Sequence, residues 1–202
     1  MKNNVWEGYF GDEYVKRNEF TDSDLKNREV FWRRIAQALQ FGGEHEDIEN
    51  VYEFGCGQGI NIVALDNVSI KKLNFHVTEI NKNATKELKK NIRGVKIYED
   101  IPSNIAEVAI TSGVLIHIDP DMLLDTMKKI YYSTSAYIIC SEYFSPDCRM
   151  IPYRGKDNIL WSNDFGKIWV NNFNLRVVDC FFNWKVTTGL DNTTTWVLEK
   201  VN

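Results

Sequence analysis

A glycine-rich stretch constrains this chain more than any other feature. Residues 51–54 have strand character and run directly into a turn with glycines at positions 55, 57 and 59. The apolar segment 60–65 that follows is typical of the start of a helix. Glycine permits positive φ and lets a ligand approach the backbone without meeting a Cβ, and a helix start offers free N–H donors. The stretch therefore predicts a strand, a turn and a helix that together hold a nucleotide or a nucleotide-like cofactor.

The glycine spacing distinguishes between cofactor classes. Dinucleotide-binding folds carry GxGxxG, whose third glycine comes one residue later than in Gly55-x-Gly57-x-Gly59. Glu53 also stands on the strand before the turn, where a carboxylate would repel a pyrophosphate but could hold the ammonium of an amino-acid cofactor. The pattern Glu53-x-Gly-Cys-Gly-x-Gly, with Glu79 further on, resembles the first motif of class I S-adenosylmethionine-dependent methyltransferases. Two alternatives remain. One is a glycine-rich turn that binds no ligand, and the other, the weakest, is a nicotinamide oxidoreductase.

Composition sets broad limits on the class of protein. A length of 202 residues predicts a single domain spanning 1–202. The net charge of −4 argues against broad nucleic-acid binding. No apolar run is long enough to span a bilayer and the start does not resemble a signal sequence, so a cytoplasmic protein is expected. The four cysteines form no CxxC pair and the three histidines are scattered, which predicts neither a disulfide framework nor a metal site. The oligomeric state stays open.

The rest of the chain alternates strands and helices. A helix is expected from Thr21 or Ser23 to about Leu39, with Thr21 and Asp24 as a loose capping box. Further helices are predicted from 60 and at 83–91, 120–132 and 164–173, and strands at 51–54, 73–80, 95–98, 106–113, 136–143, 175–184 and 193–200. This alternation implies a parallel, doubly wound sheet, and the last two strands add an antiparallel hairpin. We expect a three-layer, Rossmann-like α/β fold of the class I methyltransferase type, with a seven-stranded, mostly parallel sheet.

Two more stretches resemble a narrower family. The segments Trp6-x-Gly-x-Phe-Gly-Asp-Glu-Tyr14-x-x-Arg17-Asn18 and Thr111-Ser-Gly-Val-Leu-Ile-His117-Ile are similar to those of the pseudaminic acid biosynthesis-associated methylases. The residues Tyr153-Arg-Gly155 and the segment 160–165 resemble the C-terminal pattern of that family. The resemblance implies methyl transfer from S-adenosylmethionine, with S-adenosylhomocysteine as product, to a small polar acceptor such as a sugar or nucleotide sugar of nonulosonic acid biosynthesis.

The resemblance also suggests which residues bind the cofactor. Glu79 ends the second strand, where methyltransferases place a carboxylate on the ribose diol. Asp100 is expected near the adenine, with Glu99 as its rival. Tyr14 and Arg17 would share a helical face, and Arg17 could pair with the methionine carboxylate. The complete predicted set is Tyr14, Arg17, Glu53, Gly55, Cys56, Gly57, Asn61, Glu79, Ile80, Asp100, Ile101, Thr111, Ser112 and Gly113, with residues 1–42 forming a flap and helix over the cofactor.

His117 is the best candidate for a general base. It follows the fourth strand at the carboxyl end of the sheet, where open α/β sheets bind ligands, and a histidine pKa suits neutral operation. A structural histidine bonded to a backbone carbonyl is an equal alternative, whereas His45 and His76 are poorer candidates. Tyr143, Arg154 and Trp161 are expected to bind the acceptor, the last two from the loop 144–165.

Two alternative functions remain at this point. One is a methyltransferase for a nucleic acid or protein acceptor. Nucleic acid is disfavoured by the acidic charge and by the absence of an Asn/Asp-Pro-Pro-aromatic motif after the fourth strand, where Thr111-Ser-Gly-Val stands. The other is a module that binds S-adenosylmethionine without turnover.

Overall fold

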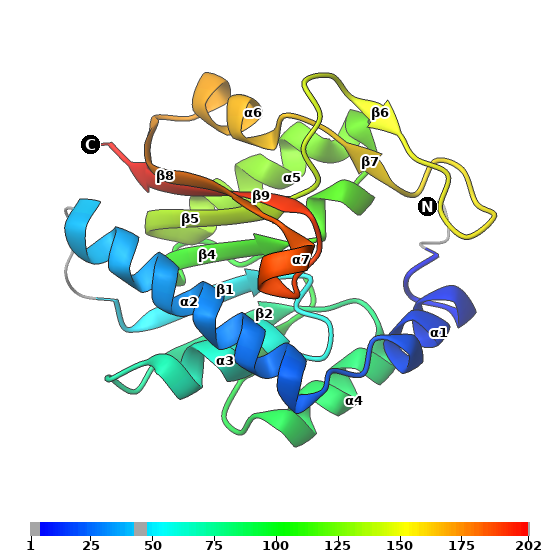
Figure 1. Cartoon of the computed structure of the whole chain (residues 1–202), viewed down its shortest axis with the longest axis horizontal. Coiled ribbons are helices and arrows are strands. Elements are labelled where there is room, and N and C mark those ends of the chain that lie inside the picture. Colours follow the sequence, from blue (N-terminus) through cyan, green and yellow to red (C-terminus); the bar gives the residue numbers. More distant parts are fainter. Residues whose placement is uncertain (1–4, 43–47, 202) are drawn as a thin grey trace.

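A seven-stranded sheet forms the centre of the protein (Figure 1). The computed structural model describes residues 5–42 and 48–201, the side chains of 40–42 excepted. The strands lie in the order β3 (Lys96–Tyr98), β2 (Asn74–Thr78), β1 (Asn50–Phe54), β4 (Ala106–Ser112), β5 (Thr134–Glu142), β9 (Thr193–Lys200) and β8 (Leu175–Asn183). The first five run parallel, and β9 is antiparallel to both β5 and β8. The predicted mostly parallel sheet that ends in an antiparallel hairpin is therefore confirmed.

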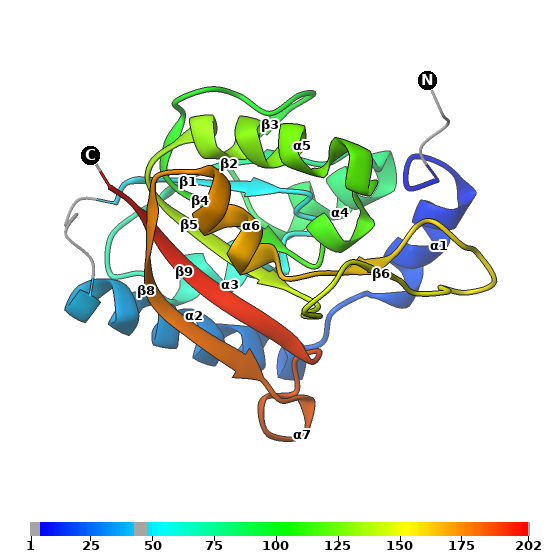
Figure 2. The same ribbon diagram turned by 90° about the horizontal axis from the view of Figure 1, so that it is seen from above.

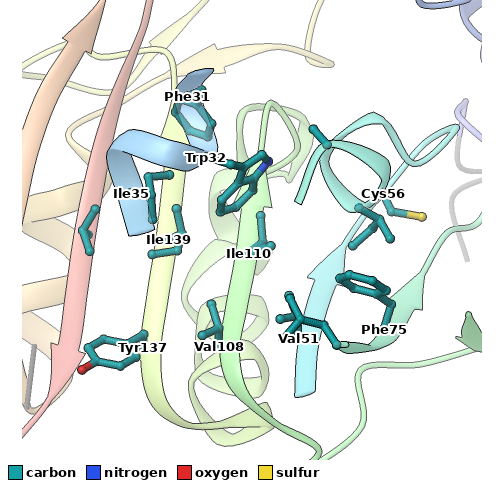
Figure 3. Packing of buried hydrophobic residues seen from close by; sticks show 14 of the residues in the cluster. Phe31, Trp32, Ile35, Val51, Cys56, Phe75, Val108, Ile110, Tyr137 and Ile139 are labelled. Atoms are coloured by element: carbon teal, nitrogen blue, oxygen red, sulfur yellow. The ribbon is translucent and has the colours of Figure 1, made fainter. Parts of the chain in front are cut away.

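Helices cover both faces of the sheet, as Figure 2 shows for α2 (Asp22–Gly42) on one side and α5 (Pro120–Ser133) on the other. Two hydrophobic clusters result. The first joins α2, α3 (Ile60–Val68) and α4 (Lys82–Asn91) to the sheet, and Figure 3 shows Trp32 and Ile35 of this cluster above the central strands. The second joins α5 and α6 (Phe165–Asn172) to the opposite face. No helix in the described part of the chain is long and apolar enough to cross a membrane.

Side-chain caps mark where several of the helices begin. The capping box predicted before α2 is present: the Asp24 carboxylate accepts from the Thr21 N–H at 2.8 Å, and the Thr21 hydroxyl accepts from the Asp24 N–H at 3.2 Å. Asn81 accepts from two backbone N–H groups at the start of α4. Asp119 caps α5, whose first residue is Pro120, a position that needs no N–H donor.

The flap and helix expected within residues 1–42 include a short regular helix, α1 (Tyr9–Arg17). The structure differs from the sequence predictions in two connections. The segment 144–165 is not one long loop, because β6 (Arg149–Met150) and β7 (Trp161–Ser162) pair as a small hairpin. A one-turn helix, α7 (Lys185–Thr188), also interrupts the connection between β8 and β9.

Strand order determines where a ligand can bind. The chain crosses over between β1 and β4, which are neighbours at the centre of the sheet, so connections leave towards opposite faces there. Open α/β sheets bind ligands at such a switch point, at the carboxyl ends of the strands. The glycine turn after β1 lies at this position.

Gly166 of α6 provides a test of how closely the second cluster packs. A Cβ at this position would lie 2.2 Å from the Trp196 Nε1 of β9 and 2.5 Å from its Cδ1. Alanine normally stabilises a helix relative to glycine by about 1 kcal/mol, whereas overpacking a core costs about 1–3 kcal/mol. We therefore expect Gly166→Ala to lower the free energy of unfolding in urea by about 1–2 kcal/mol despite its better helix propensity.

Val170→Ala is the matched control, because Val170 belongs to the same helix and its side chain is exposed. Its free energy of unfolding should stay within about 0.5 kcal/mol of that of the unchanged chain. A Gly166→Ala protein at least as stable as the unchanged chain would contradict the packing described here.

Candidate active site

A cavity of about 490 Å³ opens at the carboxyl ends of β1, β2 and β4. The glycine turn, α1, the first turns of α2 and the start of α5 complete its walls. Twelve of the predicted cofactor residues line it: Tyr14, Glu53, Gly55, Cys56, Gly57, Asn61, Glu79, Ile80, Asp100, Ile101, Ser112 and Gly113. The topology therefore brings together side chains that the sequence spreads over a hundred residues.

The three glycines of the turn serve different purposes, although all have positive φ. A Cβ on Gly55 would lie 2.4 Å from a methyl of Val114, and one on Gly59 would lie 2.3 Å from a methyl of Leu88. These two glycines let the turn pack against its neighbours. A Cβ on Gly57 would meet nothing within 4 Å, so close packing does not explain that glycine and its backbone is open to a ligand.

One end of the cavity holds a buried polar group made by Arg28, Glu53 and Asn61. The Asn61 amide donates to Glu53 Oε1 at 2.6 Å, and Arg28 Nη1 lies 3.5 Å from the Ser112 hydroxyl. Arg28 Nε, Glu53 Oε2 and Asn61 Oδ1 are buried without a hydrogen-bond partner among the described residues. Buried polar atoms are rarely left unpaired, because each costs free energy. This end is therefore built for a ligand with both donors and acceptors.

Burial changes the protonation of this group. Burial raises the pKa of the Glu53 carboxyl to about 8, while the hydrogen bond from Asn61 and the charge of Arg28 act in the opposite direction. Burial also lowers the pKa of Arg28. A cationic ligand group beside Glu53 would favour its ionised form, since an opposite charge lowers the pKa of a carboxyl.

The other end of the cavity is defined by Glu79 and by the loop after β3. The Glu79 carboxylate accepts from the Gly57 N–H at 2.8 Å and from the Asn81 N–H at 2.7 Å, so its position is fixed. Burial raises the pKa of Glu79. Asp100 is exposed and lies 3.2 Å from the Lys129 ammonium. Glu99 lines the cavity too, so the choice between Glu99 and Asp100 stays open.

The N-terminal segment covers this cavity and is tied to it by two amide side chains. Gln58 of the glycine turn donates to the Val15 carbonyl at 2.7 Å. Asn81 donates to the Trp6 carbonyl at 2.9 Å and to the Asp12 carboxylate at 3.0 Å. Trp6 in turn packs on the imidazole of His117, with ring centroids 4.3 Å apart.

His117 ends the short helix η1 (Leu115–His117) and lines the cavity. Its Nδ1 lies 2.7 Å from the Ile159 carbonyl oxygen. Because a carbonyl can only accept, Nδ1 carries the proton and Nε2 of the neutral ring keeps its lone pair. Burial lowers the pKa of His117 to about 4, so the ring is neutral at physiological pH but is a weaker base than the ordinary histidine that the sequence analysis expected.

Glu142 holds the segment that carries His117, a role that the sequence did not reveal. Its fully buried carboxylate accepts from the N–H groups of Val114 and Leu115 at 3.2 and 3.1 Å, with that of Ile116 at 3.5 Å. Burial raises the pKa of Glu142 to about 7, and these bonds oppose the rise. Only its position at the carboxyl end of a buried strand could have suggested a site role.

The structure does not place every predicted residue in the cavity. Arg17 is exposed and does not line it; Arg28 of α2 provides the arginine instead. Thr111 is fully buried in β4 and does not reach the cavity surface. Arg28 could have been noticed from sequence, since it precedes Phe31, Trp32 and Ile35 at helical spacing and so stands on the apolar face of its helix.

The three residues predicted to bind the acceptor do not lie together in the structure. Tyr143 lines a second, smaller cavity, whereas Arg154 is exposed and Trp161 is buried away from both cavities. His76 lies outside the cavities, with its Nδ1 3.0 Å from the Tyr98 hydroxyl, and His45 lies outside the described residues. Among the described residues, no cluster of His, Cys, Asp and Glu could hold a metal ion.

Solved structures show what the chain resembles as a fold. It matches the 1,6-didemethyltoxoflavin-N1-methyltransferase of Burkholderia thailandensis at 12% identity, with a TM-score of 0.69 over 95% of this chain and 85% of that one. It matches magnesium protoporphyrin IX methyltransferase of Synechocystis PCC 6803 at 12% identity and a TM-score of 0.68 over 98% of both chains. The N-methyltransferase NodS of Bradyrhizobium japonicum WM9 matches at 11% identity and a TM-score of 0.66, over 99% of this chain and 100% of that one.

All three of these structures contain S-adenosylhomocysteine. No family model and no curated protein sequence matches the chain. At such low identity the likeness concerns the fold alone: the chain has the Rossmann-like α/β fold of the class I methyltransferases.

Proposed function

We propose that this protein is an S-adenosylmethionine-dependent methyltransferase acting on a small polar acceptor of the sugar or nucleotide-sugar class. The observation that carries the proposal is the buried group of Arg28, Glu53 and Asn61, whose unpartnered atoms lie at one end of a cavity beside the glycine turn. The sulfur cofactors bound to the similar structures belong to the same class of ligand.

The residues present fit each part of this cofactor. The methionine part carries one carboxylate and one ammonium, which match the guanidinium of Arg28 and the carboxylate of Glu53 in charge. Glu79, fixed by two backbone N–H groups, retains lone pairs for the two ribose hydroxyls. Asp100 or Glu99, with Ile80 and Ile101, would receive the adenine.

The bound cofactor supplies an electrophilic methyl group on a sulfonium sulfur, and the chain supplies position and a base. The cavity walls would position the two reactants, and positioning contributes much of the acceleration in such displacements. His117 Nε2 accepts the proton of an acceptor hydroxyl. Trp6 and the Ile159 carbonyl fix the ring from two sides, so the base stays oriented.

The segment that covers the cavity favours a small acceptor over a macromolecule. Residues 5–18 lie over the cavity through bonds from Gln58 and Asn81, which limits access for a folded chain or a duplex. Tyr153 and Leu160 of the segment 144–165 line a neighbouring cavity. We assign residues 5–42 to cofactor enclosure and 144–165 to the acceptor side, within one catalytic domain.

The assignment of Arg28 leads to the first functional prediction. Arg28→Gln should weaken binding of S-adenosylhomocysteine, measured by calorimetric titration, by about tenfold to a hundredfold, because a charged hydrogen bond contributes about 1.5–3 kcal/mol. Arg17→Gln is the matched control and should change the affinity less than about twofold, since Arg17 is exposed and does not line the cavity. Equal losses in both variants would contradict the assignment.

The assignment of His117 as base leads to a second prediction. His117→Gln should lower kcat by about a hundredfold to ten-thousandfold, as for removal of a general base, while the affinity for S-adenosylhomocysteine changes little. An unchanged kcat would leave His117 a structural role. Absence of methyl transfer by the unchanged chain would instead favour the binding module without turnover.

The protonation of His117 can be measured directly. Its folded pKa lies below that of an ordinary histidine, so the neutral base is present at physiological pH and is lost as the pH falls towards about 4. Nitrogen NMR of the imidazole should show a neutral ring with the proton on Nδ1 down to about pH 5. A titration midpoint near the ordinary value of about 6.5 would contradict this environment.

A further inference from the structure

A second cavity of about 170 Å³ shares part of its wall with the first. Tyr14, Arg28, Ser112 and His117 line both cavities. Its other lining residues include Ser141 of β5, Thr193 at the start of β9, and Tyr153 and Leu160 of the segment 144–165. A molecule held in the second cavity would therefore lie next to the proposed base and beside the proposed cofactor.

Hydroxyl groups make up the floor of this cavity. Ser141 Oγ of β5 lies 3.0 Å from Thr193 Oγ1 of β9, and both residues line the cavity. Behind them, Thr195 donates to Ser141 at 2.9 Å, and the Asn183 amide donates to Thr193 at 3.0 Å and to Thr195 at 2.9 Å. A hydroxyl can both donate and accept, so this buried floor complements ligand hydroxyls without carrying charge.

Three tyrosines form the walls above this floor: Tyr14, Tyr143 and Tyr153. Burial raises the pKa of Tyr14 to about 12, and the nearby Tyr153, Tyr143 and Asp191 add to the rise. The Tyr14 phenol is therefore a neutral hydrogen-bonding group, and all three side chains place a hydroxyl on an apolar ring. Such rings can contact the apolar faces of a sugar-like ring while their hydroxyls bond to its edge.

Charge in this cavity does not favour an anion. Of the described residues that line it, Arg28 is the only lysine or arginine, and the proposed function engages Arg28 with the cofactor. Asp191 at the edge is exposed, with Lys185 2.8 Å away. Arg154, which the sequence analysis assigned to acceptor binding, and the nearby Lys156 are exposed and do not line the cavity.

We infer that the second cavity is the acceptor site and that it takes an uncharged, polyhydroxylated ring of the size of a single sugar. The inference rests on the proposed function for the reaction itself. An acceptor hydroxyl oxygen forms a bond to the methyl carbon, the carbon–sulfur bond breaks with its electron pair going to sulfur, and the hydroxyl proton passes to His117 Nε2. A charged part of a larger acceptor, such as the phosphates of a nucleotide sugar, lies outside this cavity.

Glucose and glucuronate are suitable probes because they differ by one carboxylate on the same ring. Their dissociation constants are measured by ligand-observed NMR on the full chain, with and without S-adenosylhomocysteine. We expect glucose to bind with millimolar affinity and about tenfold more tightly than glucuronate. Equal or tighter binding of glucuronate, or binding of neither sugar, would overturn the inference.

Variants connect the binding to the cavity floor and wall. Thr193→Val and Tyr143→Phe each remove one hydroxyl and should weaken glucose binding about threefold to tenfold, the usual effect of one hydrogen bond. Thr194→Val is the matched control, because Thr194 is the next residue of β9 and does not line the cavity. Glucose affinity unchanged in both Thr193→Val and Tyr143→Phe would place the sugar elsewhere.

The two proposals fail separately in this experiment. If S-adenosylhomocysteine binds but the glucose preference is absent, only the acceptor site is wrong. If glucose binds as expected and S-adenosylhomocysteine does not, the proposed function is wrong while the cavity remains a neutral sugar site.

Discussion

The left-handed turn between β1 and α3 is the constraint on which the site depends. Gly55 and Gly59 have positive φ and pack so closely against Val114 and Leu88 that a side chain would not fit. This packing sets the end of β1 beside the segment after β4 and beside α4. Gly57, between them, turns its N–H to the Glu79 carboxylate. One turn thus fixes the distance between Glu53 at one end of the cavity and Glu79 at the other.

The buried group of Arg28, Glu53 and Asn61 shows how the fold prepares this site for a charged ligand. Removing charges from water is costly unless they are paired and hydrogen-bonded, and several atoms of this group have no partner among the described residues. The Arg28 guanidinium lies 5.4 Å from the ring centroid of Phe31, which belongs to the hydrophobic cluster shown in Figure 3. A zwitterionic ligand would supply the missing partners.

Sequence reasoning predicted the features that are local. The strand, turn and helix around the three glycines, the carboxylate at the end of β2 and the capping box of α2 depend on neighbouring residues and follow from the sequence. Arg28 was missed because its role depends on how α2 crosses the sheet. Arg154 and Trp161 were misplaced because β6 and β7 pair as a hairpin, which buries Trp161 and leaves Arg154 exposed with φ of 51°.

The most direct test of the central claim compares S-adenosylhomocysteine with methylthioadenosine, which has the adenosine and sulfur but lacks the amino acid. Calorimetric titration gives both dissociation constants, with NAD as a third ligand. The account predicts that S-adenosylhomocysteine binds at least about a hundredfold more tightly than methylthioadenosine, since only it pairs Arg28 and Glu53, and that NAD binds weakly or not at all. Equal affinities for S-adenosylhomocysteine and methylthioadenosine, or tight binding of NAD alone, would contradict this account.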